Sequence, residues 1–226
     1  MIISHKHKFI FVKTRKTAGT SVQEALERIC GPGDIVTRTG IWNNTYHPRN
    51  FRGRVNPLPY LFHKPRRHRA GRILKRTLTG ERIFDHMYLY ELFALPEAQT
   101  WCGYYKFCIE RNPWDKMVSR YFWKYRDRHS RPDFESFIAN YRDVSDFDLY
   151  SLDGNVAVDF VGRYEDLSGS LAKIAAVINC EIPLPGFRNA NTRKERDYRT
   201  MYTPKLREIV ARTFAREIAA LDYSFD

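Results

Sequence analysis

Short apolar runs, each followed by a polar turn and then a helical pattern, recur along the chain. Residues 8–13, 105–110 and 158–161 are such runs, as expected of strands buried on both faces of a parallel sheet. After the first run, apolar residues repeat at the spacing of one helix face: Val22, Ala25, Leu26 and Ile29. A last helix is predicted to begin at Thr203–Pro204, an N-cap followed by proline. This alternation predicts an α/β fold of three layers, with helices flanking a central, mostly parallel sheet.

One segment, residues 52–82, departs from this alternation. It contains ten Lys or Arg and one acid, Glu81, so it carries about nine of the twelve excess positive charges of the 226-residue chain. Little apolar periodicity precedes Ile73. We therefore expect a single domain over residues 1–226, with a basic surface excursion at about 52–82. The surplus charge favours anionic ligands such as nucleotides, acidic glycans, nucleic acid or acidic lipids.

Nothing in the sequence predicts a membrane anchor or a secreted protein. No apolar run reaches 18 residues, and residues 1–6 lead into a strand-like segment without room for a signal peptide. The four cysteines show neither CxxC pairing nor metal-ligand spacing, so reduced thiols are favoured over two bridges. A cytoplasmic location is the resulting expectation.

The polar segment after the first strand, residues 13–21, has the features of a phosphate-binding loop. A loop between a buried strand and a helix start presents free backbone N–H groups and the positive end of the helix dipole. Gly19 allows close approach of a ligand, and Lys16 adds a mobile charge. Hydroxyl donors are added by Thr17, Thr20 and Ser21. Arg15 stands where the Walker A pattern requires glycine, which disfavours an ATPase or kinase. The alternative is a helix start rich in capping residues.

A second anion loop is predicted after the strand at 105–110. Arg111 follows the strand directly, and Ser119 is expected about one turn into a helix capped by Asp115. The planar guanidinium binds phosphate at two points. Because ligands of open α/β sheets bind at the carboxyl ends of strands, both loops should lie at one edge and suit a ligand with phosphates at both ends. Trp114 and Tyr121 are interpreted as packing residues.

These segments resemble the sulfotransferases that use 3′-phosphoadenosine-5′-phosphosulfate (PAPS). The resemblance is to the carbohydrate branch in particular, which includes heparan sulfate 2-O-sulfotransferases and bacterial sulfotransferase family 2 proteins. Residues 160–167 and 221–225 are similar to further landmarks of that family. The donor-binding residues implied by the resemblance are Lys16, Thr17, Ala18, Gly19, Thr20 and Ser21 for the 5′-phosphosulfate, and Arg111 and Ser119 for the 3′-phosphate.

The resemblance also implies a P-loop-like fold, PAPS as the donor substrate, and transfer of a sulfuryl group to a hydroxyl without a metal. His86 occupies the position of a general base, although relatives usually carry lysine before it and small residues after it, where this chain has Asp85 and Met87. A structural histidine is the alternative. If Asp85 lies near the imidazole, it should raise the pKa of His86. Lys16 would neutralise the leaving phosphate oxygen.

A polar loop at residues 189–198 corresponds to the family segment that closes over nucleotide and acceptor, and Arg193 is its candidate ligand contact. A solvated linker is the alternative interpretation of this loop.

His5 and His7 share a strand face, but no further ligands accompany them, so no metal site is predicted. The acceptor is expected to be an anionic glycan.

Two other classes of protein compete with this interpretation. A nucleotide-dependent kinase or NTPase would use similar loops, and a nucleic-acid-binding protein would use the arginine-rich excursion. The nucleic-acid-binding interpretation is disfavoured because the charge is concentrated in one insertion while the remaining chain has the pattern of an enzyme. No specific nucleic-acid partner is therefore expected.

Overall fold

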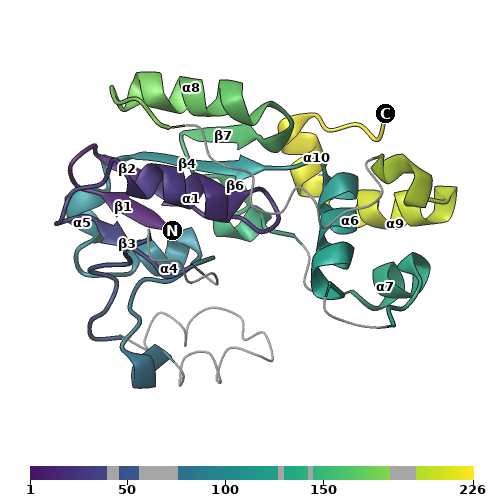
Figure 1. Ribbon diagram of the computed structural model, residues 1–226, viewed down its shortest axis with the longest axis horizontal. Helices are drawn as coiled ribbons and strands as arrows, with labels where there is room; N and C mark the ends of the chain where they lie inside the picture. Colours follow the sequence, from purple (N-terminus) through teal and green to yellow (C-terminus); the bar gives the residue numbers. More distant parts are fainter. Residues whose placement is uncertain (40–45, 56–75, 127–129, 142–144, 184–196) are drawn as a thin grey trace.

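The computed structural model describes residues 1–39, 46–55, 76–126, 130–141, 145–183 and 197–226 (Figure 1). Its centre is a five-stranded sheet in the order β3–β1–β2–β4–β7. The strands are β1 (Ile2–Ser4), β2 (Phe9–Val12), β3 (Ile35–Val36), β4 (Tyr105–Glu110) and β7 (Phe160–Arg163). β2, β4 and β7 are parallel neighbours, whereas β1 is antiparallel to both β2 and β3. The predicted mostly parallel sheet is confirmed, since only β1 runs against the other four.

The antiparallel hairpin at the start of the chain was not predicted. β1 pairs with β2 in the register Ile2↔Phe11, and the chain reverses between them at residues 5–8. The Asp34 carboxylate accepts the backbone N–H groups of His5 (2.7 Å) and Lys6 (3.1 Å) in this turn. Lys8 adopts a left-handed φ of +56° before the chain enters β2. A distant carboxylate thus satisfies the turn, which local sequence patterns do not reveal.

Helices cover both faces of the sheet and form the predicted three layers (Figure 1). One face packs against α1 (Gly19–Glu27) and α8 (Leu167–Val177). The other face packs against α4 (Leu89–Phe93), α5 (Ala98–Trp101) and the 3-10 helix η1 (Phe147–Leu149). The small hairpin of β5 (Ser151–Leu152) and β6 (Asn155–Val156) follows η1. Because both faces are covered, the apolar runs of β2 and β4 are continuous rather than alternating.

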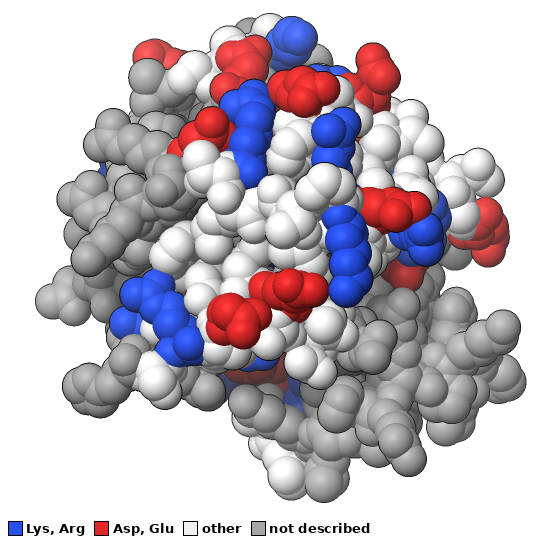
Figure 2. All heavy atoms as spheres, turned by 90° about the vertical axis from the view of Figure 1, so that its right-hand side faces the viewer, with Lys and Arg blue, Asp and Glu red and all other residues white. Residues whose placement is uncertain are grey.

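A third apolar cluster joins helices beyond one end of the sheet (Figure 1). It contains side chains of α6 (Pro113–Lys124), α7 (Phe134–Asn140) and α9 (Pro204–Thr213), with α10 (Ala215–Leu221) beside it. On the face of the molecule that these helices share, basic and acidic side chains alternate (Figure 2). Exposed ion pairs on these helices include Lys205–Glu135 and Arg212–Glu208. Among the residues that the structure describes, the excess positive charge therefore does not gather on this face.

The N-caps of two helices test two predictions: the predicted cap of α6 is wrong and the predicted cap of α9 is confirmed. α6 begins at Pro113 with Asn112 as N-cap, whose side chain accepts the Trp114 N–H at 3.1 Å, so Asp115 is not the cap. An asparagine followed by proline is the stronger N-terminal signal. The Thr203 cap of α9 is confirmed, with its hydroxyl accepting from Leu206 N at 3.3 Å. The predicted last helix is divided in two at Phe214, a buried residue between α9 and α10.

We expect Gly162→Ala to destabilise the protein by about 1–3 kcal/mol through overpacking. A Cβ at this position in β7 would lie 2.7 Å from Ile109 Cδ1 and 2.9 Å from Ser170 Cβ, so strand and helix would have to separate. Urea unfolding measures the effect. Gly103→Ala is the matched control, because its Cβ would meet nothing within 4 Å. Equal stability of the two variants would contradict this packing.

Candidate active site

The two predicted anion loops lie side by side at the carboxyl ends of adjacent parallel strands. The first loop follows β2 and the second follows β4, and these strands pair in the register Val12↔Cys108. The Arg111 side chain reaches across and donates from Nη1 to the Lys16 carbonyl at 3.2 Å. Thr14 Oγ1 also donates to the Ile109 carbonyl. The structure therefore brings Lys16 and Arg111 together, although 95 residues separate them.

The backbone of the first loop is shaped to receive an anion. Lys16 and Ala18 adopt left-handed φ angles of +63° and +57°. Such alternation turns successive N–H groups toward one point, and it is costly for residues other than glycine. α1 begins without a side-chain cap hydrogen bond and without an acidic residue in its first turn. The backbone N–H groups at the start of α1 therefore have the arrangement that binds anions at helix N-termini.

Gly19 lies where the loop folds back closely on the strand, so a larger residue here would be tightly packed. A Cβ here would lie 3.0 Å from Lys13 Cγ and 3.1 Å from the Thr14 carbonyl oxygen. Thr17 is buried and its hydroxyl is 2.8 Å from that of Thr14, so its predicted role as a ligand donor competes with an internal bond. Thr20 is partly exposed and Ser21 is buried in the first turn of α1.

The Lys16 ammonium lies among other cations. Its Nζ is 5.2 Å from the centre of the Trp123 ring. Desolvation, together with the positive charges of Arg111, Arg120 and Arg126, lowers the pKa of Lys16 to about 7. An anion bound beside these groups would stabilise the charged lysine, so anion binding and Lys16 protonation are expected to be coupled.

The Arg111 guanidinium is held from several sides. Asp115 Oδ2 accepts from Nε at 2.7 Å and pairs with Nη2 at 2.6 Å, while the Tyr164 ring lies 4.0 Å below the guanidinium carbon. Asp115, predicted as a helix cap, therefore orients the arginine. Arginine has five N–H donors, so a phosphate can share the group with Asp115. Ser119 is the seventh residue of α6 and partly exposed, nearly two turns from the helix start rather than the predicted one.

Residues 160–167 and 221–225, which resemble further segments of the sulfotransferase family, both hold the second loop in place. In the first of these segments, Glu165 Oε1 accepts the Asn112 backbone N–H at 2.6 Å. From residues 221–225, the Ser224 carbonyl accepts from Asn112 Nδ2 at 2.7 Å, and the Tyr223 hydroxyl donates to Glu165 at 3.3 Å. Phe225 packs edge-on against Trp114, with ring centres 5.6 Å apart. These segments thus fix the peptide that follows Arg111.

His86 lies against the first loop in a fixed tautomer. Its Nδ1 is 2.9 Å from the Lys13 carbonyl oxygen, which can only accept, so Nδ1 carries the proton and a neutral ring leaves the Nε2 lone pair available. The residue has a φ of +58°, a strained conformation of the kind that clusters at functional sites. Burial lowers the pKa of His86 to about 4, against the opposing field of Asp85.

Asp85 raises the pKa of His86, as expected of a neighbouring carboxylate, but burial outweighs this effect and the net shift is downward. Its carboxylate is occupied by Lys13 Nζ at 2.5 Å and by the Met1 ammonium at 2.7 Å. Burial alone would raise the pKa of Asp85, and these two cations hold it below its usual range. Lys13 thus contributes to the site through both its carbonyl and its ammonium, a role that sequence reasoning missed.

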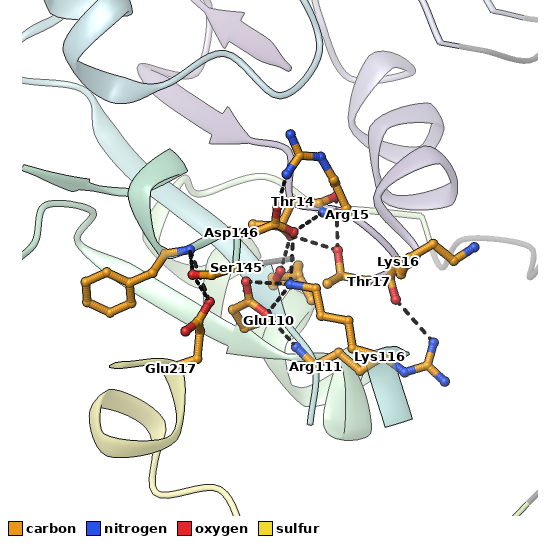
Figure 3. A network of polar contacts seen from close by, with 12 residues as sticks. Thr14, Arg15, Lys16, Thr17, Glu110, Arg111, Lys116, Ser145, Asp146 and Glu217 are labelled. Carbon is orange, nitrogen blue, oxygen red and sulfur yellow. Dashed lines mark hydrogen bonds and ion pairs between the residues drawn. The ribbon is translucent and has the colours of Figure 1, made fainter. Parts of the chain in front are cut away.

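A buried charge cluster beneath the loops was also missed (Figure 3). Lys116 Nζ contacts Glu110 Oε2 and Asp146 Oδ2, both at 2.9 Å. Asp146 also pairs with Arg15 Nη1 at 2.7 Å. Arg15, which replaces the Walker A glycine, is thus an anchor of the loop. The available signals were a glutamate ending an apolar strand and a lysine on the apolar face of α6.

Several predictions fall on parts of the chain that the structure does not describe. Arg193 lies outside the described residues, as does the central part of the basic excursion, residues 56–75. Among the described residues, no group of three or more His, Cys, Asp or Glu could hold a metal ion. Within the same ranges, the helices are all too short or too polar to cross a bilayer.

No model of a known protein family matches the chain. An uncharacterized protein of Archaeoglobus fulgidus is 40% identical over 78 residues, which make up 32% of this chain and 65% of that protein. The match thus spans less than two thirds of that relative. A mouse sulfotransferase solved in complex with PAP superposes with a TM-score of 0.50 at 19% identity, over 97% of this chain and 87% of that chain. For a sulfotransferase from Alicyclobacillus acidocaldarius the TM-score is 0.45 at 16% identity, over 96% of each chain.

The chain therefore has the fold of the sulfotransferases, a P-loop-like arrangement of a mostly parallel sheet between helices. This confirms the predicted fold class. The assignment to the carbohydrate branch stays a prediction.

Proposed function

We propose that this protein is a sulfotransferase that moves a sulfuryl group from PAPS to a hydroxyl group. The observation that carries the proposal is the meeting of two cationic loops at one sheet edge, where Arg111 Nη1 reaches the Lys16 carbonyl. Lys16 and the uncapped start of α1 suit the 5′-phosphosulfate, and Arg111 with Ser119 suits the 3′-phosphate. A nucleotide phosphorylated at both ends matches this pair of sites better than ATP does. The PAP bound to the mouse structural neighbour agrees with such a donor.

In the proposed reaction the acceptor oxygen attacks sulfur in line with the bridging oxygen of the phosphosulfate. A bond forms between sulfur and the acceptor oxygen, and the bond between sulfur and the bridging oxygen breaks. The acceptor proton moves to His86 Nε2, whose lone pair the Lys13 carbonyl leaves available by holding the proton on Nδ1. Lys16 neutralises the charge that develops on the leaving phosphate of PAP.

A cavity that reaches Asp85, the residue before His86 in the sequence, supports an anionic carbohydrate as the acceptor. It has a volume of about 260 Å³ and is lined by Arg38, Phe51, Arg76, Glu81, Ile83, Phe84 and Asp85, and Arg38 pairs with Glu81 at 3.7 Å. The Arg76 guanidinium lies 3.0 Å from the centre of the Phe84 ring, and Arg38 lies 5.5 Å from that of Phe51. Aromatic faces suit a sugar ring, and the guanidinium groups suit a carboxylate or sulfate.

We expect the double variant Arg38→Glu with Arg76→Glu to raise the KM for an acidic glycan about tenfold or more, since hydrogen bonds to charged groups contribute about 1.5–3 kcal/mol each. Release of PAP from PAPS is measured against a uronic-acid polysaccharide and against its carboxyl-reduced form. Arg212→Glu, on the exposed surface of α9, is the control. An unchanged KM would reject this cavity as the acceptor site. Failure of every hydroxyl acceptor to release PAP would reject sulfuryl transfer itself.

A further inference from the structure

The two anion loops are joined beneath the site by a continuous chain of buried contacts (Figure 3). Asp146 Oδ2 accepts the backbone N–H of Arg15 at 2.7 Å, and Lys116 Nζ lies 2.9 Å from the same oxygen. Lys116 also donates to Glu110 Oε2 at 2.9 Å, and that oxygen accepts the backbone N–H of Arg111 at 3.1 Å. The chain thus starts at the residue before Lys16 and ends at Arg111 itself.

Each linking side chain is closed off from water. Asp146 and Glu110 are fully buried, and Lys116 is 3% exposed. Burial alone would lower the pKa of Lys116, but the two carboxylates raise it, so the lysine stays charged. Burial alone would raise the pKa of Asp146, but Lys116 and Arg15 lower it. Buried ion pairs recover little of their desolvation cost, so their contribution to stability is a weak reason for this cluster.

These contacts hold backbone N–H groups next to the residues of the two loops that are proposed to bind the anions. Lys16 has a φ of +63°, and the peptide N–H one residue before it is held by Asp146. The same carboxylate binds the Arg15 guanidinium at 2.7 Å, so Arg15 is fixed by both its main chain and its side chain. On the other side, the Arg111 N–H is fixed by Glu110. A bridge of short, buried contacts sets the separation of the loops with little freedom to adjust.

We propose that Asp146 is a positioning residue that sets the two loops at the spacing required by a nucleotide carrying both a 5′- and a 3′-phosphate. The proposal rests on the proposed function, because it assigns the two loops to the two ends of one ligand. Asp146 belongs to the segment that enters η1, outside both loops, and its side chain is fully buried. Its effect is exerted through Arg15 and Lys116.

The test is Asp146→Asn, which keeps the size of the side chain and removes its charge. Calorimetric affinities for PAP and 5′-AMP are measured for wild type and variant at a temperature where both are folded. We expect the ratio of the two affinities to fall about tenfold or more, because the 3′-phosphate no longer meets a correctly placed Arg111. A general loss of stability would not change this ratio. Asp34→Asn is the matched control, since Asp34 is 1% exposed and hydrogen bonded but remote from both loops.

A second readout needs no nucleotide. Amide hydrogen exchange at Arg15 and Arg111 should accelerate in Asp146→Asn, whereas exchange within β2 should not. If the wild-type protein does not bind PAP, the proposed function is wrong. Amide hydrogen exchange then still shows whether Asp146 links the two loops. If Asp146→Asn does not fold, Asp146→Glu replaces it: this variant keeps the charge but displaces the carboxylate by one methylene, and the same changes are expected. A folded variant with unchanged affinity ratio and unchanged exchange overturns the proposal.

Discussion

Arg111→Ala is expected to weaken PAP binding by about 100-fold, the equivalent of about 3 kcal/mol. The variant removes the group that would pair with the 3′-phosphate, and it also removes the donor to the Lys16 carbonyl. Asp115 would then lose both of its contacts to Arg111, at 2.7 and 2.6 Å, and leave a carboxylate facing the anion site. Repulsion by this carboxylate adds to the loss of the cation.

The affinity for 5′-AMP should fall much less in this variant, because AMP lacks the 3′-phosphate. Isothermal titration measures both ligands. Arg49→Ala is the control: Arg49 is also partly buried and pairs with a carboxylate, Glu27 at 2.6 Å, but it lies at the other end of α1. Equal losses for PAP and AMP in Arg111→Ala would remove Arg111 from the 3′-phosphate site.

His86→Asn is expected to lower turnover by ~10²-fold or more, the usual contribution of a general base, while PAP affinity stays within about twofold. Asparagine tolerates the φ of +58° better than most residues, and its amide can still donate to the Lys13 carbonyl. The substitution therefore preserves the local structure and removes the Nε2 lone pair. Release of PAP from PAPS in the presence of acceptor measures turnover. Near-normal turnover in this variant would exclude His86 as the base.

The same assignment predicts an unusual dependence on pH. A histidine acts as a base only when neutral, and burial lowers the pKa of His86 from 6.5 to about 4. The acidic limb of kcat/KM, which reports the free enzyme, should therefore lie near pH 4, and activity should persist through pH 5–6 where an ordinary histidine would already be protonated. A limb near pH 6.5 would show that the titrating base is not in this buried environment.

Local patterns in the sequence were sufficient for the elements that carry the chemistry. The strand over residues 105–110 is found as predicted, because its run of apolar residues is covered on both faces. Gly19 and Arg111 could be proposed as ligand-binding residues because an anion loop needs a small residue and a planar cation at fixed positions relative to a strand. These requirements act within a few residues and are therefore visible in the sequence.

The contacts that fix the geometry of the site could not be predicted in this way. Asp146 reaches Arg15 across 131 residues, and Lys13 reaches Asp85 across 72. No periodicity encodes such pairs, because they depend on which elements the fold places side by side. The net effect on the pKa of His86 was missed for the same reason: the charge of Asp85 is visible in the sequence, but the burial of the ring is not.

Isothermal titration of the wild-type protein with PAP, with 5′-AMP and ATP as controls, decides whether the two loops bind one nucleotide. We expect one site of micromolar affinity for PAP and affinity at least about tenfold weaker for both controls, because only PAP places phosphates at Lys16 and Arg111 together. Equal affinity for PAP and AMP, or no binding of PAP by the folded protein, would contradict the assignment of the two loops to a single 3′-phosphorylated nucleotide.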